Sequence, residues 1–240
     1  MKRKGFVFII VGLIFFVTGC ATSGMTALLA QKDTIALVSV ISNEDINWQG
    51  EAPTNPDSLG PLVRRKLRNE PDMAAITKAD EVVNTAEGMF REAMAASGRF
   101  NLAEKEAVLN SRSYQDAKER KYPNRDVVKP ENFRLIDIKD KDFLSALAAE
   151  TGIRKTMFLE FNFTKFIYTG MSLVGSARAH VEMTVIILDE NRKTLYRKTI
   201  SSGSGEGTKV VNGVYSQSEM LALFRDAIDA VCFELLEQFN

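Results

Sequence analysis

Histidine and cysteine are both scarce in this chain of 240 residues, which contains one His and two Cys. Zinc sites and His-dependent catalytic triads draw on such side chains, so neither kind of centre is expected. Two cysteines are also too few for a disulfide scaffold. Basic and acidic residues balance at 31 each, without the basic excess typical of nucleic-acid-binding proteins, so no nucleic-acid partner is predicted. The hydrophobic fraction of 45% is sufficient for a globular core.

The N-terminus differs from the rest of the chain. Met1–Lys4 is basic, and Gly5–Val17 is an uncharged apolar run. This run is shorter than the roughly 20 residues of a membrane-spanning helix, but it has the length and flanks of a signal-peptide core. The next residues complete Val17–Cys20, which resembles the lipobox of bacterial lipoproteins. In those proteins the cysteine thiol receives a diacylglycerol and the chain is cut before it.

The resemblance implies cleavage between Gly19 and Cys20 and lipid attachment at Cys20. Residues 1–19 are then a signal peptide and residues 20–33 a lipidated, flexible tether. The mature chain keeps 28 basic and 31 acidic residues, a net charge of −3. Ala21 is not the Asp that commonly retains lipoproteins in the inner membrane, so the expected location is the periplasmic face of the outer membrane. An uncleaved signal anchor and an ordinary secretory peptide are the alternatives.

Hydrophobic periodicity predicts an α/β fold for the remainder of the chain. We expect a mixed, largely antiparallel sheet of about four to five strands flanked by helices, in one domain over residues 34–240 with a long insertion at about 42–80. The predicted strands are 34–41, 99–103, 133–138, 156–167, 177–187 and 194–202, and the predicted helices are 62–68, 80–97, 104–120, a segment between Asp140 and Gly152, and 218–239. Residues 42–61 and 203–217 are predicted to be loops.

Several segments resemble the CsgG/LpoB-type periplasmic lipoprotein domains. They are Ile35–Val40, Phe90–Leu102, Ala146–Gly152 with Lys155–Phe163, and Val181–Lys198. The insertion at 42–80 and the stretch at 118–140 depart from the simplest form of the family. The resemblance implies an anticodon-binding-domain-like layout. It also implies a non-enzymatic role in envelope assembly or export, through an envelope protein partner or as a homo-oligomer.

Few residues suggest a catalytic or ligand-binding role. His180 lies on the polar side of a predicted strand near Glu182, as a surface or hydrogen-bonded residue. Glu160 and Glu182 could form a pair of hydrolytic carboxylates, although carboxylates are abundant. Gly203–Gly207 lacks the following helix of a phosphate-binding loop. Cys232 lies in an apolar helical pattern and is expected in the core. No cofactor and no metal are predicted.

Candidate partner-contact residues are Trp48, Arg64 and Arg65. A single Trp can fill the core or anchor a partner. The basic cluster can contact lipid headgroups or peptidoglycan, or form a solvated face. The leading hypothesis is a membrane-anchored, non-enzymatic protein that acts through protein contacts. The alternatives are an envelope ligand-binding protein or hydrolase using loops 42–61 and 203–217, and a component of an oligomeric ring or pore.

Overall fold

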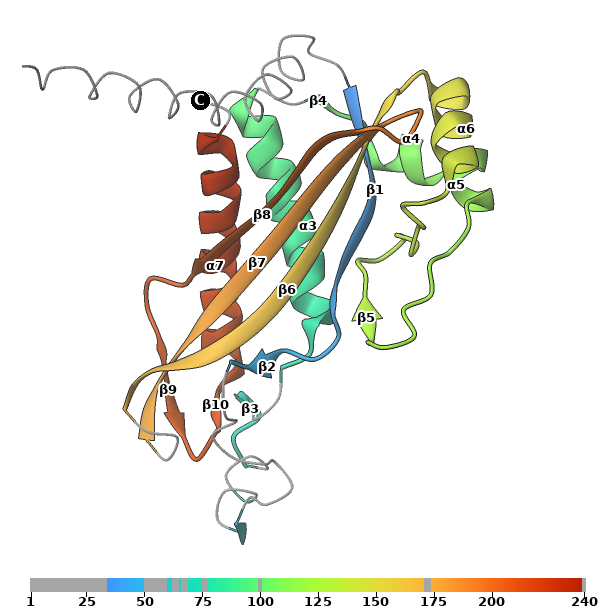
Figure 1. Ribbon diagram of the computed structural model, residues 1–240. Coiled ribbons are helices and arrows are strands. Elements are labelled where there is room, and N and C mark those ends of the chain that lie inside the picture. Colours follow the sequence, from blue (N-terminus) through green and yellow to red (C-terminus); the bar gives the residue numbers. More distant parts are fainter. Residues whose placement is uncertain are drawn as a thin grey trace, which may run out of the picture.

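The computed structural model describes residues 34–49, 60–61, 65, 69–74, 77–98, 101–170 and 174–238. Within them, a long twisted sheet carries two long helices along one face and a group of shorter helices beside one end (Figure 1). The predicted signal peptide, the predicted tether and most of the predicted helix at 62–68 lie outside the described residues.

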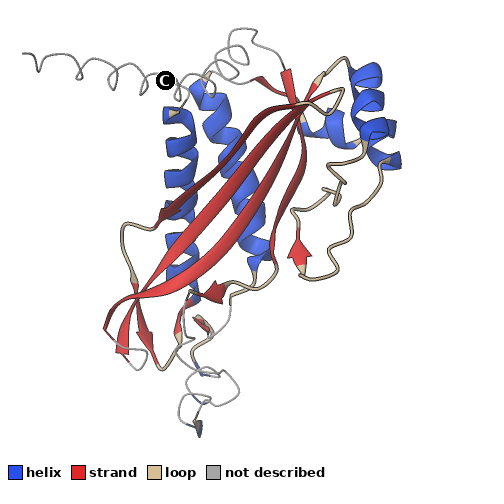
Figure 2. Ribbon diagram, viewed as in Figure 1, coloured by secondary structure: helices blue, strands red, loops and turns tan. Residues whose placement is uncertain are grey.

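Five strands form the central path of the sheet. Their order is β4 (Asn101–Leu102), β1 (Thr34–Asn43), β6 (Lys155–Gly170), β7 (Val174–Asp189) and β8 (Thr194–Gly203). β1 runs parallel to β4 and β6, whereas β6, β7 and β8 are antiparallel. Short strands β2 (Asn47–Trp48), β5 (Val127–Val128) and β9 (Thr208–Val211) pair with this path. The predicted fold class is therefore confirmed (Figure 2).

Strand alternation decides which face of the sheet is buried. In β6, Met157, Leu159, Phe161 and Phe163 are at most 1% exposed, and their partners on β7 form an equally buried row. Because side chains alternate between the faces of a strand, one face of the β6–β7 hairpin is buried and largely apolar. β1 is buried along nearly its whole length, as its continuous apolar sequence predicts.

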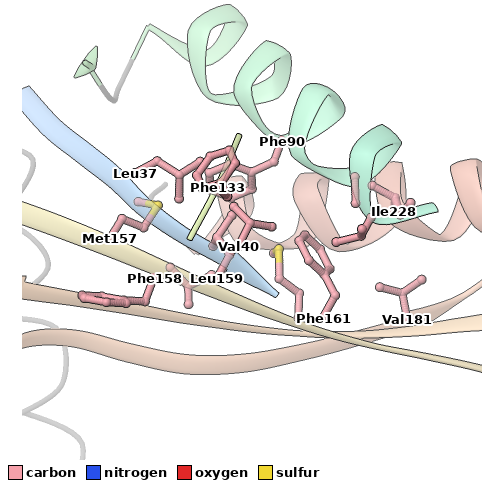
Figure 3. Close-up of a cluster of buried hydrophobic side chains, with 14 of the residues drawn as sticks. Leu37, Val40, Phe90, Phe133, Met157, Phe158, Leu159, Phe161, Val181 and Ile228 are labelled. Carbon is pink, nitrogen blue, oxygen red and sulfur yellow. The ribbon is translucent and has the colours of Figure 1, made fainter. Parts of the chain in front are cut away.

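Two long helices cover the apolar face. α3 (Ala79–Ser97) and α7 (Gln217–Glu237) pack against each other and against the sheet. In Figure 3, Phe90 of α3 and Ile228 of α7 point toward the strand residues. The predicted end of α3 is confirmed, because Gly98 adopts a left-handed conformation with φ of 61°. α7 begins just before the predicted start, where the Ser216 hydroxyl accepts a hydrogen bond from the Glu219 N–H.

Three short helices lie beside the end of the sheet where β1 begins (Figure 1). They are α4 (Lys105–Leu109), α5 (Arg112–Asp116) and α6 (Lys141–Thr151). The prediction of a single helix at 104–120 is wrong, because the Ser111 hydroxyl caps α5 by accepting from the Tyr114 N–H and so interrupts the helix. α6 lies within the predicted segment between Asp140 and Gly152: the Asp140 carboxylate accepts from the Phe143 N–H, and Gly152 ends the helix.

Both predicted long loops contain strands. Residues 203–217 include β9, which pairs with the first part of β7, and β10 (Tyr215–Ser216), which pairs with β3 (Met73–Ala74). The described part of 42–61 contains β2, which pairs with β6. These strands are too short to have a pattern of their own, and only their partners define them. The predicted strand at 133–138 is an isolated bridge between Glu119 and Ile136.

Candidate functional site on the uncovered sheet face

The sheet face opposite α3 and α7 is covered over part of its length. Residues around Tyr122 and Ile136 lie over Phe158 and enclose a small hollow there. Arg125 closes this cover with an ion pair to Glu160, at 2.6 Å. No helix of the described residues packs over β6 and β7 on this side (Figure 1). This part of the sheet face is therefore not covered by a described helix.

Three cross-strand pairs form this open surface. They are Asn162 with Glu182, Thr164 with His180, and Phe166 with Arg178, and we call these six residues the distal face. Asn162 and Glu182 are exposed, and the other four are half-buried. The pairs alternate along the hairpin with buried residues such as Phe163 and Val181, so they project away from the helices.

Aromatic and cationic groups meet at the end of the distal face. The Arg178 guanidinium carbon lies 3.5 Å from the centre of the Tyr168 ring. Tyr168 is 53% exposed, and the Phe166 and His180 rings lie edge to face with centres 6.5 Å apart. The Arg178 Nε is buried and lacks a hydrogen-bond partner among the described residues. Tyr and Arg are among the residues that dominate binding energy in protein interfaces.

The hairpin tip extends this surface. Gly170 has φ of 85°, and a Cβ at this position would lie 2.6 Å from the Val174 carbonyl oxygen. Only glycine fits this close approach, so Gly170 allows the backbones of β6 and β7 to lie close together where the two strands meet. Val174, on the other side of the tip, is 60% exposed. The tip therefore presents two large exposed side chains, Tyr168 and Val174.

The distal face and the tip are remote from residue 34. β6 begins beside the start of β1, where Ile35 pairs with Lys155. The strand then runs for 16 residues to Gly170. At about 3.3 Å per residue, the tip lies roughly 50 Å from the start of β6. The two ends of the molecule thus carry different features (Figure 1).

Trp48 packs at this distal end, on the buried side of the sheet. Its half-buried ring meets the Tyr215 ring edge to face, with centres 6.1 Å apart. The Lys165 ammonium lies 5.2 Å from the centres of both rings and donates a hydrogen bond of 2.7 Å to the Ile46 carbonyl. Of the two roles weighed for Trp48, the geometry favours packing. Lys165 holds the β2 segment against β6.

The burial of Lys165 makes stability depend on pH. Burial lowers the pKa of Lys165 from 10.5 to about 8, and the charge of Asp45 acts in the opposite direction. Between these two pH values the unfolded chain binds more protons than the folded one, so the unfolding free energy rises with pH. Between pH 8 and 9.5, we expect the unfolding free energy of wild type to rise by up to about 1.4 kcal/mol per pH unit more than that of Lys165→Met. Urea denaturation at each pH measures this gain, and a constant difference between the two proteins would contradict it.

The remaining candidate residues include several that lie outside the described part of the chain. Gly19, Cys20 and Arg64 lie outside the described residues, and Arg65 is exposed. Cys232 is buried in the core, as predicted.

The structure also locates the side chains with possible chemical roles. Glu160 pairs with Arg125, whereas Glu182 is exposed. The turn at Gly205 is tied to α7, because its N–H donates to the Asp226 carboxylate at 2.6 Å. Among the described residues, no group of three or more His, Cys, Asp or Glu is placed to hold a metal ion. None of the described helices is both long and apolar enough to cross a bilayer.

Sequence reasoning missed Tyr168, Arg178 and Lys165 as residues of interest. Period-two alternation assigns Arg178 and Lys165 to opposite faces of the hairpin, but it does not say which part of a face is covered. That depends on where residues 118–139 and 215 come to lie, which local sequence does not determine.

Comparison with known proteins does not establish a family. No family description and no curated protein matches the sequence. Two of the solved structures with a distant similarity to this chain are the following. A hypothetical protein from Chlamydia trachomatis is 6% identical with a TM-score of 0.37, over 86% of this chain and 92% of that one. The LpoB C-terminal domain from Salmonella enterica is 9% identical with a TM-score of 0.27, over 76% and 95%. Likenesses this weak leave the predicted CsgG/LpoB-type membership a prediction.

Proposed function

We propose that this chain is a lipid-anchored envelope protein that acts without catalysis, by binding a protein partner through the distal face and the hairpin tip. The observation that carries the proposal is the exposed Tyr168 stacked on Arg178, beside Phe166 and His180, on a sheet face that no described helix covers. Partly exposed aromatic and guanidinium groups of this kind supply the anchors of protein interfaces.

The position of this surface suits a protein held at its N-terminus. The lipid anchor is proposed at Cys20 and the envelope as its location, in line with the signal sequence. Residues 21–33 can span at most about 45 Å, and the domain adds roughly 50 Å between residue 34 and the tip. A partner that binds the distal end can therefore stand well away from the anchoring membrane.

The chemistry of the surface defines the partner. The Arg178 guanidinium is a cation, and Tyr168 and Val174 at this end of the hairpin are large, exposed aromatic and aliphatic side chains. A carboxylate placed among apolar groups would satisfy the guanidinium and cover Tyr168 and Val174. We therefore expect a partner surface that presents an acidic residue within an apolar patch.

Site-specific photo-crosslinking in intact cells tests this proposal. A photoreactive residue at Glu182 is expected to give a covalent adduct with one envelope protein, whereas the same residue at exposed Arg225 on α7 is not. Tyr168→Ala should reduce the Glu182 adduct by about 30-fold, as expected for a hot-spot residue worth about 2 kcal/mol. Arg178→Lys should also weaken it, because Lys keeps the charge but not the planar stack.

The outcomes separate the alternatives. An adduct of twice the chain mass would replace the proposal with self-assembly into a ring or pore. An adduct that is unchanged by Tyr168→Ala, or equal at residues 182 and 225, would contradict the proposed surface. A hydrolase or ligand-binding protein predicts no adduct, and a bound small molecule or turnover by the purified protein.

A further inference from the structure

A groove between α5 and α6 lies at the other end of the molecule, near residue 34. Its volume is about 570 Å³. Ala117, Phe143 and Ala146 form its apolar part, and Arg112, Lys118 and Asp142 are among the charged residues around it. This volume is in the range of pockets that hold a compact ligand or a short peptide segment.

Hydrogen bonds fix both ends of the groove. At one end the Glu150 carboxylate accepts from the Arg112 and Ser113 N–H groups, at 2.9 Å each. At the other end the Asp140 carboxylate accepts from the Lys118 N–H at 3.1 Å. α5 and α6 are therefore antiparallel, with Glu150 and Asp140 joining them at opposite ends. The groove is built by the fold before anything enters it.

The chain leaves the described structure beside the Glu150 end. Thr34 lines a hollow of about 360 Å³ together with Thr151, Gly152 and Lys155. Thr151 is the last residue of α6 and directly follows Glu150. Residues that precede Thr34 therefore start from a hollow at the end of α6 that carries Glu150.

We propose that residues 25–32 of this chain dock in the groove as a short helix. Met25, Leu28, Leu29 and Lys32 recur at the spacing i, i+3, i+4 and i+7, which places three apolar side chains and one cation on one side of a helix. Eight helical residues are about 12 Å long, and the stretch of α6 from Asp142 to Glu150 has the same length. Lys32 then lies toward Glu150, and Met25 lies toward Asp142.

Connection to Thr34 favours this occupant over a separate molecule. A segment joined to the domain by one residue is present at an effective concentration that reaches millimolar, whereas a free peptide or a second copy loses translational freedom on binding. A helix of eight residues is unstable alone in water, so it would form only with its apolar side in the groove. Ala27, Leu28, Leu29 and Ala30 have high helix propensity, which lowers the cost of this step.

Docking would set the reach of the anchored protein. With the segment docked, only residues 21–24 separate Cys20 from the folded body, a span of at most about 14 Å, compared with about 45 Å when residues 21–33 are extended. This consequence rests on the proposed lipid anchor. The docking itself rests on the groove and the sequence of residues 25–32.

Hydrogen–deuterium exchange on the full processed chain in detergent tests the docking. Amides 26–32 are expected to exchange at least about tenfold more slowly than an unstructured chain of that sequence. Ala146→Glu puts a charge into the apolar part of the groove and should abolish this protection. Ala149→Glu is the matched control on an exposed position of α6 outside the groove, and it should leave the protection intact. Leu28→Asp places a charge on the docking segment instead of the groove, and it should also abolish the protection.

Three results would overturn the proposal. Exchange of residues 26–32 at the unstructured rate in wild type would show that the segment does not dock. If Ala146→Glu left the exchange protection of residues 26–32 unchanged, the segment would dock outside the groove. Protection that disappears on dilution would assign the groove to a second copy. None of these results depends on crosslinking at Glu182, so the docking and the proposed function can fail separately.

Discussion

Cys20→Ser is expected to abolish membrane attachment through acyl chains. A serine hydroxyl cannot take the place of the thiol that receives the diacylglycerol in lipoproteins. Two or three acyl chains provide stable anchoring, at about 0.8 kcal/mol per buried CH₂, whereas the rest of the mature chain shows no comparable apolar segment. Cell fractionation with mass spectrometry of the N-terminal peptide measures the change. In wild type this peptide should begin at Cys20 and carry the lipid mass.

Cys232→Ser is the matched control for this prediction. Cys232 lies in α7, is 1% exposed, and has its thiol pKa raised to about 12 by burial and by the charge of Asp229. Its substitution changes core packing and leaves the anchor in place, so the protein should remain in the membrane fraction. An unmodified Cys20 or an intact Met1 in wild type would contradict the lipid anchor. Either result would favour the signal-anchor or secretory alternative.

Phe163→Ala is expected to cause a large loss of stability. Phe163 belongs to β6, and its side chain is fully buried on the side that faces α7. Its ring stacks on Phe161 with centres 5.6 Å apart and meets Phe224 edge to face at 5.7 Å. Removing a buried phenyl ring leaves a cavity in the core and costs about 3–5 kcal/mol of unfolding free energy. The urea concentration at the midpoint of unfolding should fall, whereas the dependence of the unfolding free energy on urea concentration should change little.

Phe233→Ala provides the comparison, because it removes the same ring from the solvent side of α7. Phe233 is 64% exposed, so its loss should change the unfolding free energy by no more than about 0.5 kcal/mol. Similar losses for the two variants would mean that the packing of α7 against β6 differs from that described. Phe163→Leu keeps most of the apolar volume, so its loss of unfolding free energy should lie between those of Phe163→Ala and Phe233→Ala.

The sequence alone predicted the elements that have strong local patterns. The alternation in 156–167 and 177–187 identified the central hairpin, because a half-buried strand repeats every two residues. The apolar stripe from Val83 to Met94, with Gly98 after it, identified α3 and its end. The charge and apolar run of residues 1–17 likewise indicate a signal peptide without any knowledge of the fold.

Elements without such patterns were predicted incorrectly. The segment 104–120 has enough helix-forming residues to suggest one helix, but the Ser111 hydroxyl and the packing of Tyr114 in the core divide it. β9 and β10 have only four and two residues, and their strand conformation exists because β7 and β3 supply hydrogen-bond partners. Pairing over long sequence separations is a tertiary effect, so local propensity does not show it.

The sequence by itself determined the α/β class and the face of β6 and β7 that is buried, and it predicts the anchor motif at Cys20. The tertiary structure decided which polar residues are exposed. It placed Arg178 on Tyr168 at the end remote from residue 34, enclosed Lys165 between Trp48 and Tyr215, and formed the α5–α6 groove beside Thr34. The physical reason is that a strand pattern assigns side chains to a face, whereas their exposure depends on distant segments that pack over that face.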